Sequence, residues 1–446
     1  MTAAAQERTR FYQLCALAAL LVALMPATLL AFKVWGDNGY MVLAVLAGLV
    51  ALAASYVAER APLVRSLWLI VIVAIGLRVV LLTLDPLLSS DIYRYVWDGR
   101  VQASGINPYR YIPADPTLAA LRDAAIYPNI NRFDYAVTIY PPVAQMFFLV
   151  VTRIGESVTV MRLAFLGCEV VTVTMIWLLL QRLGQPVTRL VAYLWHPLPM
   201  WEIANNGHID ALMVALMMTG LWLVIGGKAL RGVAAIALAA VAKPFAVLAL
   251  PACWRPWDWR APALAVAIAA ACYAPYLAVG FGVIGFLPGY VSEERIDDGS
   301  DNWPLNIVRL LIGAHPGDAV VYFALAGVVV GGLALAVAFR KDRTPDIVLG
   351  DTAMLLLVFL LLLSPKYPWY FLAIMPFVAL RGGALPWAVS IGAPLLQEEV
   401  DWGTYIPLFI RQTGLYGGVA VALLWWMWNR RRLAADRGVT GHGVAS

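Results

Sequence analysis

Runs of about twenty apolar residues recur along the chain, and they constrain its fold more than any other feature. A run of this length crosses the hydrocarbon core of a bilayer as one α-helix. Hydrophobic residues make up 62% of the 446 residues and charged residues only 13%, which excludes a large soluble protein. The sequence predicts an all-α, polytopic membrane protein, with residues 1–446 as a single integral membrane domain.

Apolar windows of this length predict about twelve transmembrane helices. They lie near residues 11–32, 40–58, 67–84, 158–181, 189–206, 208–226, 260–280, 318–339, 346–363, 367–380, 384–396 and 414–428. The first two form a predicted N-terminal hairpin within residues 1–66. Arg8 and Arg10 precede a first window that is long enough to cross the membrane, so we expect no cleavable signal peptide.

Two further apolar stretches do not fit a simple crossing. Residues 143–154 are too few to span a bilayer, so we expect a re-entrant or interfacial helix there. Gly232–Cys253 is broken in its middle by Lys243-Pro244, and basic residues flank both ends. We expect a re-entrant hairpin that dips in from the cytoplasm, because a single kinked span would invert every later loop. Lys243 at its tip then needs a carboxylate, carbonyls or water as a partner, and its role stays open.

The net charge of +5 does not indicate a nucleic-acid site, because the basic residues lie at the ends of apolar runs rather than in one patch. With the N-terminus in the cytoplasm, nearly every basic loop is cytoplasmic too, as the positive-inside rule requires. Both termini are then cytoplasmic. The polar segments 85–157, 281–316 and 364–369 face outside, and we expect them to converge on one face.

The segment from Asp85 to Pro142 is a long polar interruption that carries aromatic residues and carboxylates. It is rich in Pro, Gly and Asn, and irregular backbone of this kind does not lie exposed to lipid. We therefore expect residues 85–157 to form an external loop with interfacial helices, 281–316 to form a second external loop, and the chemistry to lie in the first of them.

Several motifs around this loop carry a resemblance to a known family. SSDIYRYVWDGRVQASGINPY is followed by TIYPPVAQ, HPLPMWEIANNGHIDAL, AKPFAVLALP and SPKYPWYFLAIMP. In this order they resemble the polyprenyl-phosphate-sugar-dependent membrane glycosyltransferases of the GT-C superfamily, especially bacterial mannosyltransferase-like members. The similarity runs from about Leu77 to Pro376. In that superfamily the carboxylate loop typically follows the first transmembrane helix, whereas three predicted spans precede it here, which suggests that the N-terminal hairpin is an addition.

The resemblance implies transfer of a sugar, with mannose expected, from a polyprenyl-phosphate carrier to a lipid, glycan or protein acceptor. It also implies a GT-C-like fold in a bacterial inner membrane, an extracytoplasmic active site, a catalytic loop carboxylate and inversion at the anomeric carbon. The chain has no Walker loop and no dinucleotide fingerprint, in line with a lipid-linked donor. No cofactor is firmly implied, and a divalent metal has no support from ligand spacing. The sequence leaves the acceptor, the linkage and metal dependence open.

Asp91 is the leading candidate for the general base that deprotonates the acceptor hydroxyl, because it follows the third span and matches the superfamily's loop aspartate. The alternative is a helix N-cap, since Ser89, Ser90 and Asp91 all favour that position. Asp98 lies two helical turns further on and shares the same face, where it would bind substrate. The alternative for Asp98 is an ion pair with Arg94 or with Arg100. Arg94 is itself a further candidate for substrate binding.

Other candidates for substrate binding come from aromatic and buried ionisable residues. Tyr140 would stack on a sugar ring, or else belong to the aromatic belt at the membrane interface. Ionisable groups inside a membrane protein usually mark a functional cavity, so Glu202, His208 and Asp210 are candidates as well. Their alternative is a hydrogen-bonded turn together with Asn205 and Asn206. No spacing among them predicts a zinc site.

Binding of the carrier phosphate needs a fixed positive charge near the outer surface. Lys366 in the SPKYPWY motif is the first candidate, and Arg78 in the third span is the second. Tyr367, next to Lys366, is a further substrate-binding candidate. Both cations have the alternative of snorkelling to the lipid headgroups. A polytopic transporter or lipid flippase is the rival function, although we find no internal repeat of the kind that transporters often show.

Overall fold

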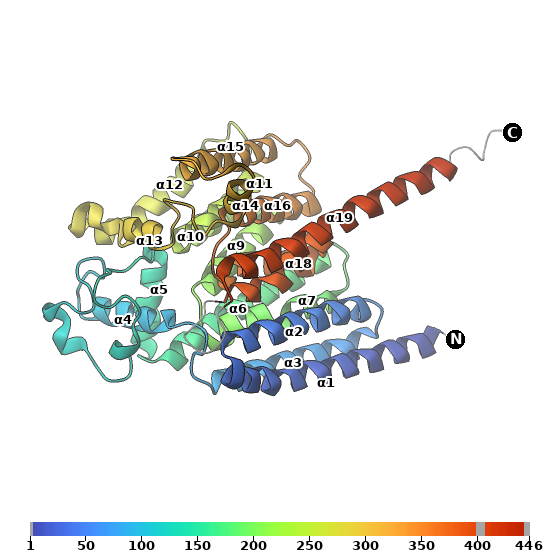
Figure 1. Cartoon of the computed structure of the whole chain (residues 1–446), viewed down its shortest axis with the longest axis horizontal. Helices are drawn as coiled ribbons and strands as arrows, with labels where there is room; N and C mark the ends of the chain where they lie inside the picture. The colour runs from blue at the N-terminus through green and yellow to red at the C-terminus, as the bar shows by residue number, and fades with distance from the viewer. Residues whose placement is uncertain (1–2, 398–405, 441–446) are drawn as a thin grey trace.

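The computed structural model describes residues 3–397 and 406–440. Every regular element in this part of the chain is helical (Figure 1), which confirms the predicted all-α fold. The longer helices are α1 Ala3–Trp35, α2 Asp37–Ala58, α3 Leu63–Leu82, α4 Asp91–Ala103, α5 Pro142–Ile154, α6 Val158–Arg182, α9 Asp210–Ile225, α10 Ala229–Ala242, α12 Arg260–Tyr273, α14 Trp303–Ile312, α15 Asp318–Ala338, α16 Pro345–Leu363 and α19 Leu408–Thr440. The shorter ones are α7 Val191–Leu194, α8 Pro197–Pro199, α11 Leu250–Cys253, α13 Leu287–Glu293, α17 Met375–Arg381 and α18 Ala384–Gly392.

Among the described residues, eight helices are long and apolar enough to cross a membrane, or nine if one sharply bent pair counts as a single span. The predicted windows at 189–206, 367–380 and 384–396 are not continuous α-helices but chains of short helical pieces. Proline explains the interruptions, because it lacks the backbone N–H that the helical ladder needs. Pro197 and Pro199 precede a π-helical turn at Met200–Asn205, and the chain then bends by 119° before α9. The number of crossings stays a prediction.

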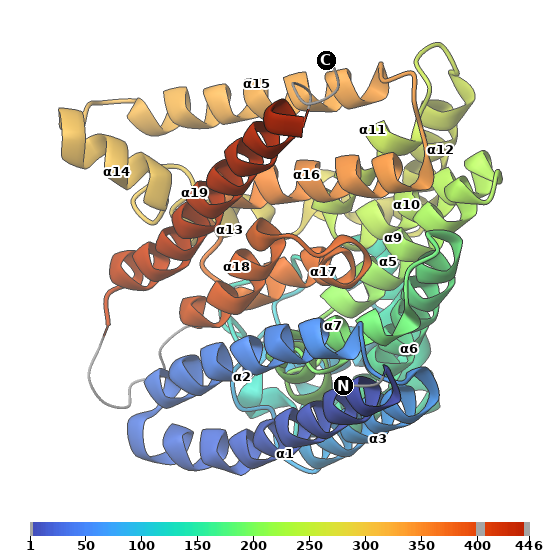
Figure 2. The same cartoon turned by 90° about the vertical axis from the view of Figure 1, so that its right-hand side faces the viewer.

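The polar elements lie at one end of the molecule. Figure 1 shows α4 and α13 at the left, with the start of α1 and the end of α19 at the opposite end. In Figure 2, α1, α2 and α3 run side by side, and both α2 and α3 contact α1. Helix α9 packs against α6 and α10 and forms the centre of the bundle.

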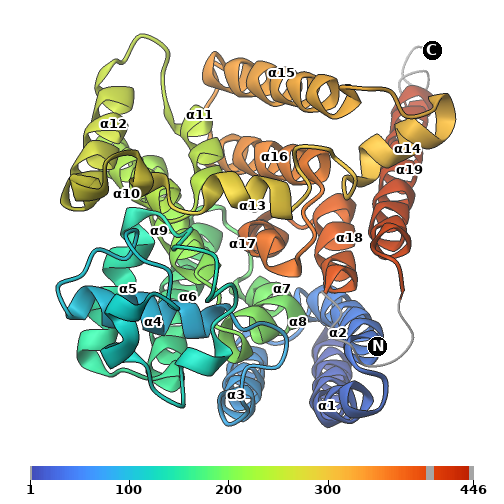
Figure 3. The ribbon, with the colours of Figure 1, turned by 60° about the vertical axis from the view of Figure 1, so that its left-hand side comes forward.

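The two stretches that did not fit a simple crossing have the predicted local structure. Residues 142–154 form the short helix α5, which begins with Pro142 at its first position and lies beside α4 (Figure 3). Helix α10 ends at Ala242, and the chain continues through a 3-10 turn at Pro244–Ala249 into α11, which contacts α10. The break at Lys243-Pro244 is therefore confirmed, while insertion of both segments into the membrane stays a prediction.

Buried amides fix the chain just before α4. Asn205 accepts a hydrogen bond from the Leu87 backbone N–H at 2.9 Å, and Asn206 accepts one from Leu88 at 3.1 Å. Arg162 from α6 donates to the Leu84 carbonyl at 2.6 Å. Irregular backbone needs such partners, because its polar groups are not satisfied within a helix. These bonds anchor the start of α4 to the bent region between α8 and α9.

The three polar segments expected on one face do lie together. Arg132 in the first segment contacts Glu293 of the second at 2.6 Å. Lys366 in the third segment contacts Glu294 and Asp301 of the second at 3.3 and 3.2 Å. The ion pairs connect the segments directly, whereas the side of the membrane that they face stays a prediction.

Candidate active site

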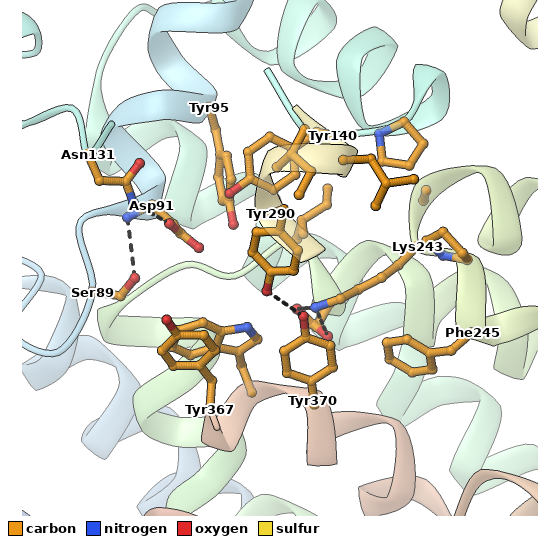
Figure 4. Close-up of a pocket in the computed structure, with 18 of the residues that line it drawn as sticks. Ser89, Asp91, Tyr95, Asn131, Tyr140, Lys243, Phe245, Tyr290, Tyr367 and Tyr370 are labelled. Atoms are coloured by element: carbon orange, nitrogen blue, oxygen red, sulfur yellow. Dashed lines mark hydrogen bonds and ion pairs between the residues drawn. The ribbon is translucent and has the colours of Figure 1, made fainter. Parts of the chain in front are cut away.

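A cavity of about 1120 Å³ lies between the start of α4, the Lys243-Pro244 turn, α13 and the segment Pro368–Ile374 (Figure 4). One part of its lining is polar, from Ser89, Asp91, Asn131, Arg132, Asp210, Lys243 and Glu293. Another part is apolar, from Val247, Leu248, Ile284, Leu287, Val330 and Phe359. A cavity of this size and mixed character suits a ligand that has a polar head and an apolar tail.

Asp91 is the first residue of α4, and its carboxylate faces the cavity (Figure 4). The Asn131 side chain donates a hydrogen bond to Asp91 Oδ1 at 2.6 Å. Ser90 is the N-cap residue and makes no side-chain capping bond, while the backbone N–H of Asp91 donates to Ser89 Oγ at 3.3 Å. The Asp91 carboxylate is therefore not used as the helix cap, and the helix N-terminus next to it favours its negative charge.

His208 and Glu202 lie behind Asp91. His208 Nδ1 is 3.8 Å from Asp91 Oδ2, and His208 Nε2 is 3.3 Å from Glu202 Oε2. Asn206 donates to Glu202 Oε2 at 3.0 Å, so the expected hydrogen-bonded turn exists as well. Both His208 and Glu202 are buried, and neither lines the cavity. The structure thus brings the three side chains together, with only Asp91 in contact with the cavity.

Asp210 and Lys243 form a buried ion pair on the cavity wall. Lys243 Nζ lies 2.8 and 2.7 Å from the two carboxylate oxygens of Asp210. It also lies 4.2 Å from the centre of the Tyr370 ring. The carboxylate that Lys243 needs at this position is therefore Asp210, which had been expected only as a substrate-binding residue.

Arg132 is a second cation on the cavity wall, and the sequence analysis did not single it out. It has a left-handed backbone with φ of 55°, which is unfavourable for a residue with a side chain and typical of functional sites. Its guanidinium contacts Glu293 and lies over the Tyr290 ring at 5.8 Å. Burial opposes the charge, but the carboxylates of Asp91 and Glu293 outweigh it and raise the pKa of Arg132. Arg132 thus carries a fixed positive charge close to Asp91.

Asp98 and Arg94 lie outside the cavity lining, in a buried network. Asp98 accepts hydrogen bonds from Arg94 at 2.8 Å, from Thr138 at 2.5 Å and from Gln145 at 3.0 Å. The structure therefore gives this pair the alternative role considered above, an ion pair within the fold. Because Thr138 and Gln145 lie beyond α4 in the chain, the network holds the end of the loop and α5 against α4.

The two cations expected to bind phosphate also lie outside the lining of the large cavity. Arg78 makes two hydrogen bonds to Glu169, at 2.8 and 2.7 Å, and is buried between α3 and α6. Lys366 lines a smaller neighbouring cavity, where Glu294 and Asp301 neutralise it. Because neither side chain lines the large cavity, the expected assignment of the phosphate role to these two residues lacks structural support.

Tyrosines form much of the remaining wall. Tyr140 and Tyr367 line the cavity as expected, together with Tyr290 and Tyr370, whose hydroxyls are 2.8 Å apart. Tyr140 packs edge-on against Tyr95 at a ring distance of 4.8 Å. Burial raises the pKa of Tyr140, so its hydroxyl stays protonated and can donate to a sugar oxygen.

Asn131, Arg132 and Glu293 are polar lining residues that the sequence did not single out, and Asn129, Tyr290 and Tyr370 are further ones. The only signal for the first three was their place in the polar segments, because nothing in their spacing links them to Asp91. Among the described residues, no group of three or more His, Cys, Asp or Glu side chains is arranged to hold a metal ion.

Comparisons with known proteins identify the family of the chain. A family model described as alpha-(1->6)-mannopyranosyltransferase, N-terminal domain, matches residues 12–259. The chain is 23% identical over 367 residues to alpha-(1->6)-mannopyranosyltransferase A of Mycobacterium tuberculosis, covering 74% of this chain and 67% of the relative. It is 25% identical over 178 residues to the protein of the same name from Corynebacterium glutamicum, covering 37% of this chain and 34% of the relative. No solved structure matches the chain. The chain therefore belongs to the MptA_B family of membrane mannosyltransferases, as the resemblance of its motifs predicted.

Proposed function

We propose that the chain transfers a mannosyl residue from a polyprenyl-phosphate carrier to a lipid-linked or glycan acceptor on the extracytoplasmic face. A protein acceptor is the third class that the chemistry allows. The observation that carries the proposal is the position of Asp91, whose carboxylate lies on a cavity lined by both polar and apolar side chains. The names of both relatives support mannose as the sugar and a primary sugar hydroxyl, O6, as the attacking group.

In the proposed reaction, Asp91 takes the proton from the acceptor hydroxyl while that oxygen bonds to the anomeric carbon. The bond from this carbon to the phosphate oxygen breaks, and its electron pair leaves with the phosphate. Attack from the face opposite the leaving group inverts the anomeric centre, so an α-linked product requires a β-linked donor. Asn131 holds the Asp91 carboxylate in place through Oδ1, which leaves Oδ2 for the acceptor.

The cavity provides a place for each part of such a donor. Arg132 is proposed to bind the phosphate, because a guanidinium forms paired hydrogen bonds with phosphate oxygens. Tyr140 and Tyr290 would contact the sugar, and the apolar wall around Val247 and Phe359 would take the first units of the prenyl chain. Asp91 lies close enough to Arg132 for its carboxylate to raise the pKa of that guanidinium.

The test uses the purified full chain in nanodiscs with polyprenyl-phosphate mannose and an alkyl α-(1→6)-dimannoside whose terminal O6 is free. We expect release of polyprenyl phosphate together with a trimannoside, detected by mass spectrometry, and loss of both products in Asp91→Asn. A transporter or flippase would move the donor lipid across the bilayer and leave it intact. Donor that stays uncleaved with mannoside acceptors, glycolipids and glycans alike would refute the proposal.

A further inference from the structure

One imidazole lies between two carboxylates at the candidate base. Asp91 Oδ2 faces His208 Nδ1 at 3.8 Å, and Glu202 Oε2 faces His208 Nε2 at 3.3 Å. The three groups differ in exposure, since the side chain of Asp91 is 15% exposed whereas those of His208 and Glu202 are 1% and 0% exposed. A proton that reaches Asp91 from the cavity therefore has a buried imidazole as its next neighbour.

The backbone from Met200 to Gly207 places His208 next to α4. Glu202 lies in the π-helical turn Met200–Asn205, and π-helical turns are frequent at functional sites. Gly207 follows with a left-handed φ of 71°, and a Cβ there would lie 2.5 Å from the side chain of Ile92, the neighbour of Asp91. Only glycine permits both this backbone conformation and this close approach. Position 207 therefore keeps His208 near the start of α4.

Glu202 and Trp369 lie next to the imidazole of His208. Glu202 Oε1 and His208 Nε2 are both buried without a hydrogen-bond partner among the described residues, so the 3.3 Å contact between His208 Nε2 and Glu202 Oε2 is close but is not a formed hydrogen bond. A buried carboxylate oxygen without a donor is costly unless a cation lies beside it. The Trp369 ring stacks on the imidazole at a centroid distance of 4.1 Å and an angle of 21°, which stabilises an imidazolium by cation–π attraction. A carboxylate and an aromatic ring thus lie beside the same imidazole.

Other charged groups around the pair already have partners. Lys243 is paired with Asp210, and Arg162 donates to the carbonyls of Leu84 and Asn205. Tyr40 of α2 lies within electrostatic range of Glu202. His208 is therefore the basic group placed to exchange a proton with Asp91.

We propose that His208 and Glu202 are positioning residues that return Asp91 to its ionised form after each transfer. The proposal rests on the proposed function, with Asp91 as the base. Once Asp91 has taken the acceptor proton, that proton moves from Asp91 Oδ2 to the lone pair of His208 Nδ1. The resulting imidazolium directs its Nε2–H toward Glu202, and Asp91 is a carboxylate again. Before the next acceptor binds, the imidazolium returns this proton through Asp91 Oδ2 to an oxygen of the departing polyprenyl phosphate, which leaves His208 neutral and Asp91 ionised. The contact of 3.8 Å is long for a hydrogen bond, as catalytic contacts often are before substrate binds.

A double-mutant cycle tests this relay. Turnover and donor affinity are measured for the wild type, His208→Gln, Asp91→Asn and the double variant, with polyprenyl-phosphate mannose and the alkyl dimannoside. His208→Gln is expected to lower kcat by about ten- to a hundredfold with unchanged donor Kd, because it acts through the base. In the Asp91→Asn background the same substitution should cost nothing further, because the group that it serves is already inactive.

Two further variants keep the test decisive. Glu202→Gln preserves the shape of the side chain and should reproduce the kcat loss of His208→Gln, even if the latter folds poorly. His196→Gln is the matched control, because His196 is equally buried, lies outside the cavity lining and is expected to leave kcat unchanged. Equal losses in both Asp91 backgrounds, a weakened donor Kd, or a wild-type kcat in both His208→Gln and Glu202→Gln would overturn the relay. A wild type that never cleaves the donor would instead refute the proposed function itself.

Discussion

Asn131 donates a hydrogen bond of 2.6 Å to Asp91 Oδ1, although forty residues separate the two in the chain. The bond joins the beginning of the polar loop to a point near its end. Arg132, the next residue, contacts Glu293 of α13 and carries a left-handed backbone. The dipeptide Asn131-Arg132 therefore holds the candidate base and also brings a cation to the same cavity. The site forms only when this loop has folded, because both residues belong to it.

Asp91→Asn tests the base directly. The variant keeps the size of the side chain and removes its basicity, so turnover should fall at least about a hundredfold, the usual contribution of a general base. Expression and melting temperature should stay near wild type, because Asp91 makes no capping bond that the fold needs. Asp134→Asn is the control, since Asp134 is exposed in the same loop. Near-normal turnover of purified Asp91→Asn would remove Asp91 from the mechanism.

Asp98→Asn should lower the stability of the fold, whereas Asp91→Asn should lower turnover. Removing this carboxylate leaves the buried guanidinium of Arg94 without its counter-ion, which typically costs about 3 to 5 kcal/mol of stability. We expect a lower melting temperature and yield, with normal donor affinity in the protein that does fold. Asp123→Asn is the comparison, because Asp123 pairs with Arg100 near the surface, where a salt bridge contributes about 0 to 1 kcal/mol. Weakened donor binding by folded Asp98→Asn would return Asp98 to the substrate site.

The membrane class of the fold could be predicted because apolar runs of spanning length are a strong signal. The predicted windows failed where proline interrupts an apolar run, as at Pro197 and Pro199, because hydropathy does not register a missing N–H. Asp91 and Tyr140 could be placed at the site because the polar loop is visible in the sequence. The partners of each charge could not be predicted. Lys366 shows the consequence, because it lies in a smaller neighbouring cavity and pairs with Glu294 and Asp301 there.

Variants of Arg132 and Lys366 test which of the two cations binds the donor phosphate. Arg132→Gln should weaken binding of polyprenyl-phosphate mannose by roughly 1.5 to 3 kcal/mol, about one to two decades in Kd, because a charge-assisted hydrogen bond is lost. Lys366→Met should leave donor Kd within about twofold of wild type, because Lys366 lines the smaller neighbouring cavity and not the large one. A donor titration of both variants in the same nanodiscs makes the comparison. The reverse order of effects would restore the phosphate role to Lys366.

The side of the membrane that holds the site can be tested by cysteine labelling. Thr117 is exposed on the polar loop, and Lys341 is exposed in the basic turn between α15 and α16. Because basic loops remain in the cytoplasm, a membrane-impermeant maleimide added to intact spheroplasts should label Thr117→Cys and not Lys341→Cys. Permeabilised cells should show labelling of both, which controls for reactivity. The wild type supplies the background, because its cysteines at 15, 168, 253 and 272 are buried or half-buried. Labelling of Lys341→Cys alone in intact spheroplasts would contradict the predicted topology, because it would place Asp91 on the cytoplasmic side. The lipid-linked donor would then have to reach the site from the cytoplasmic leaflet.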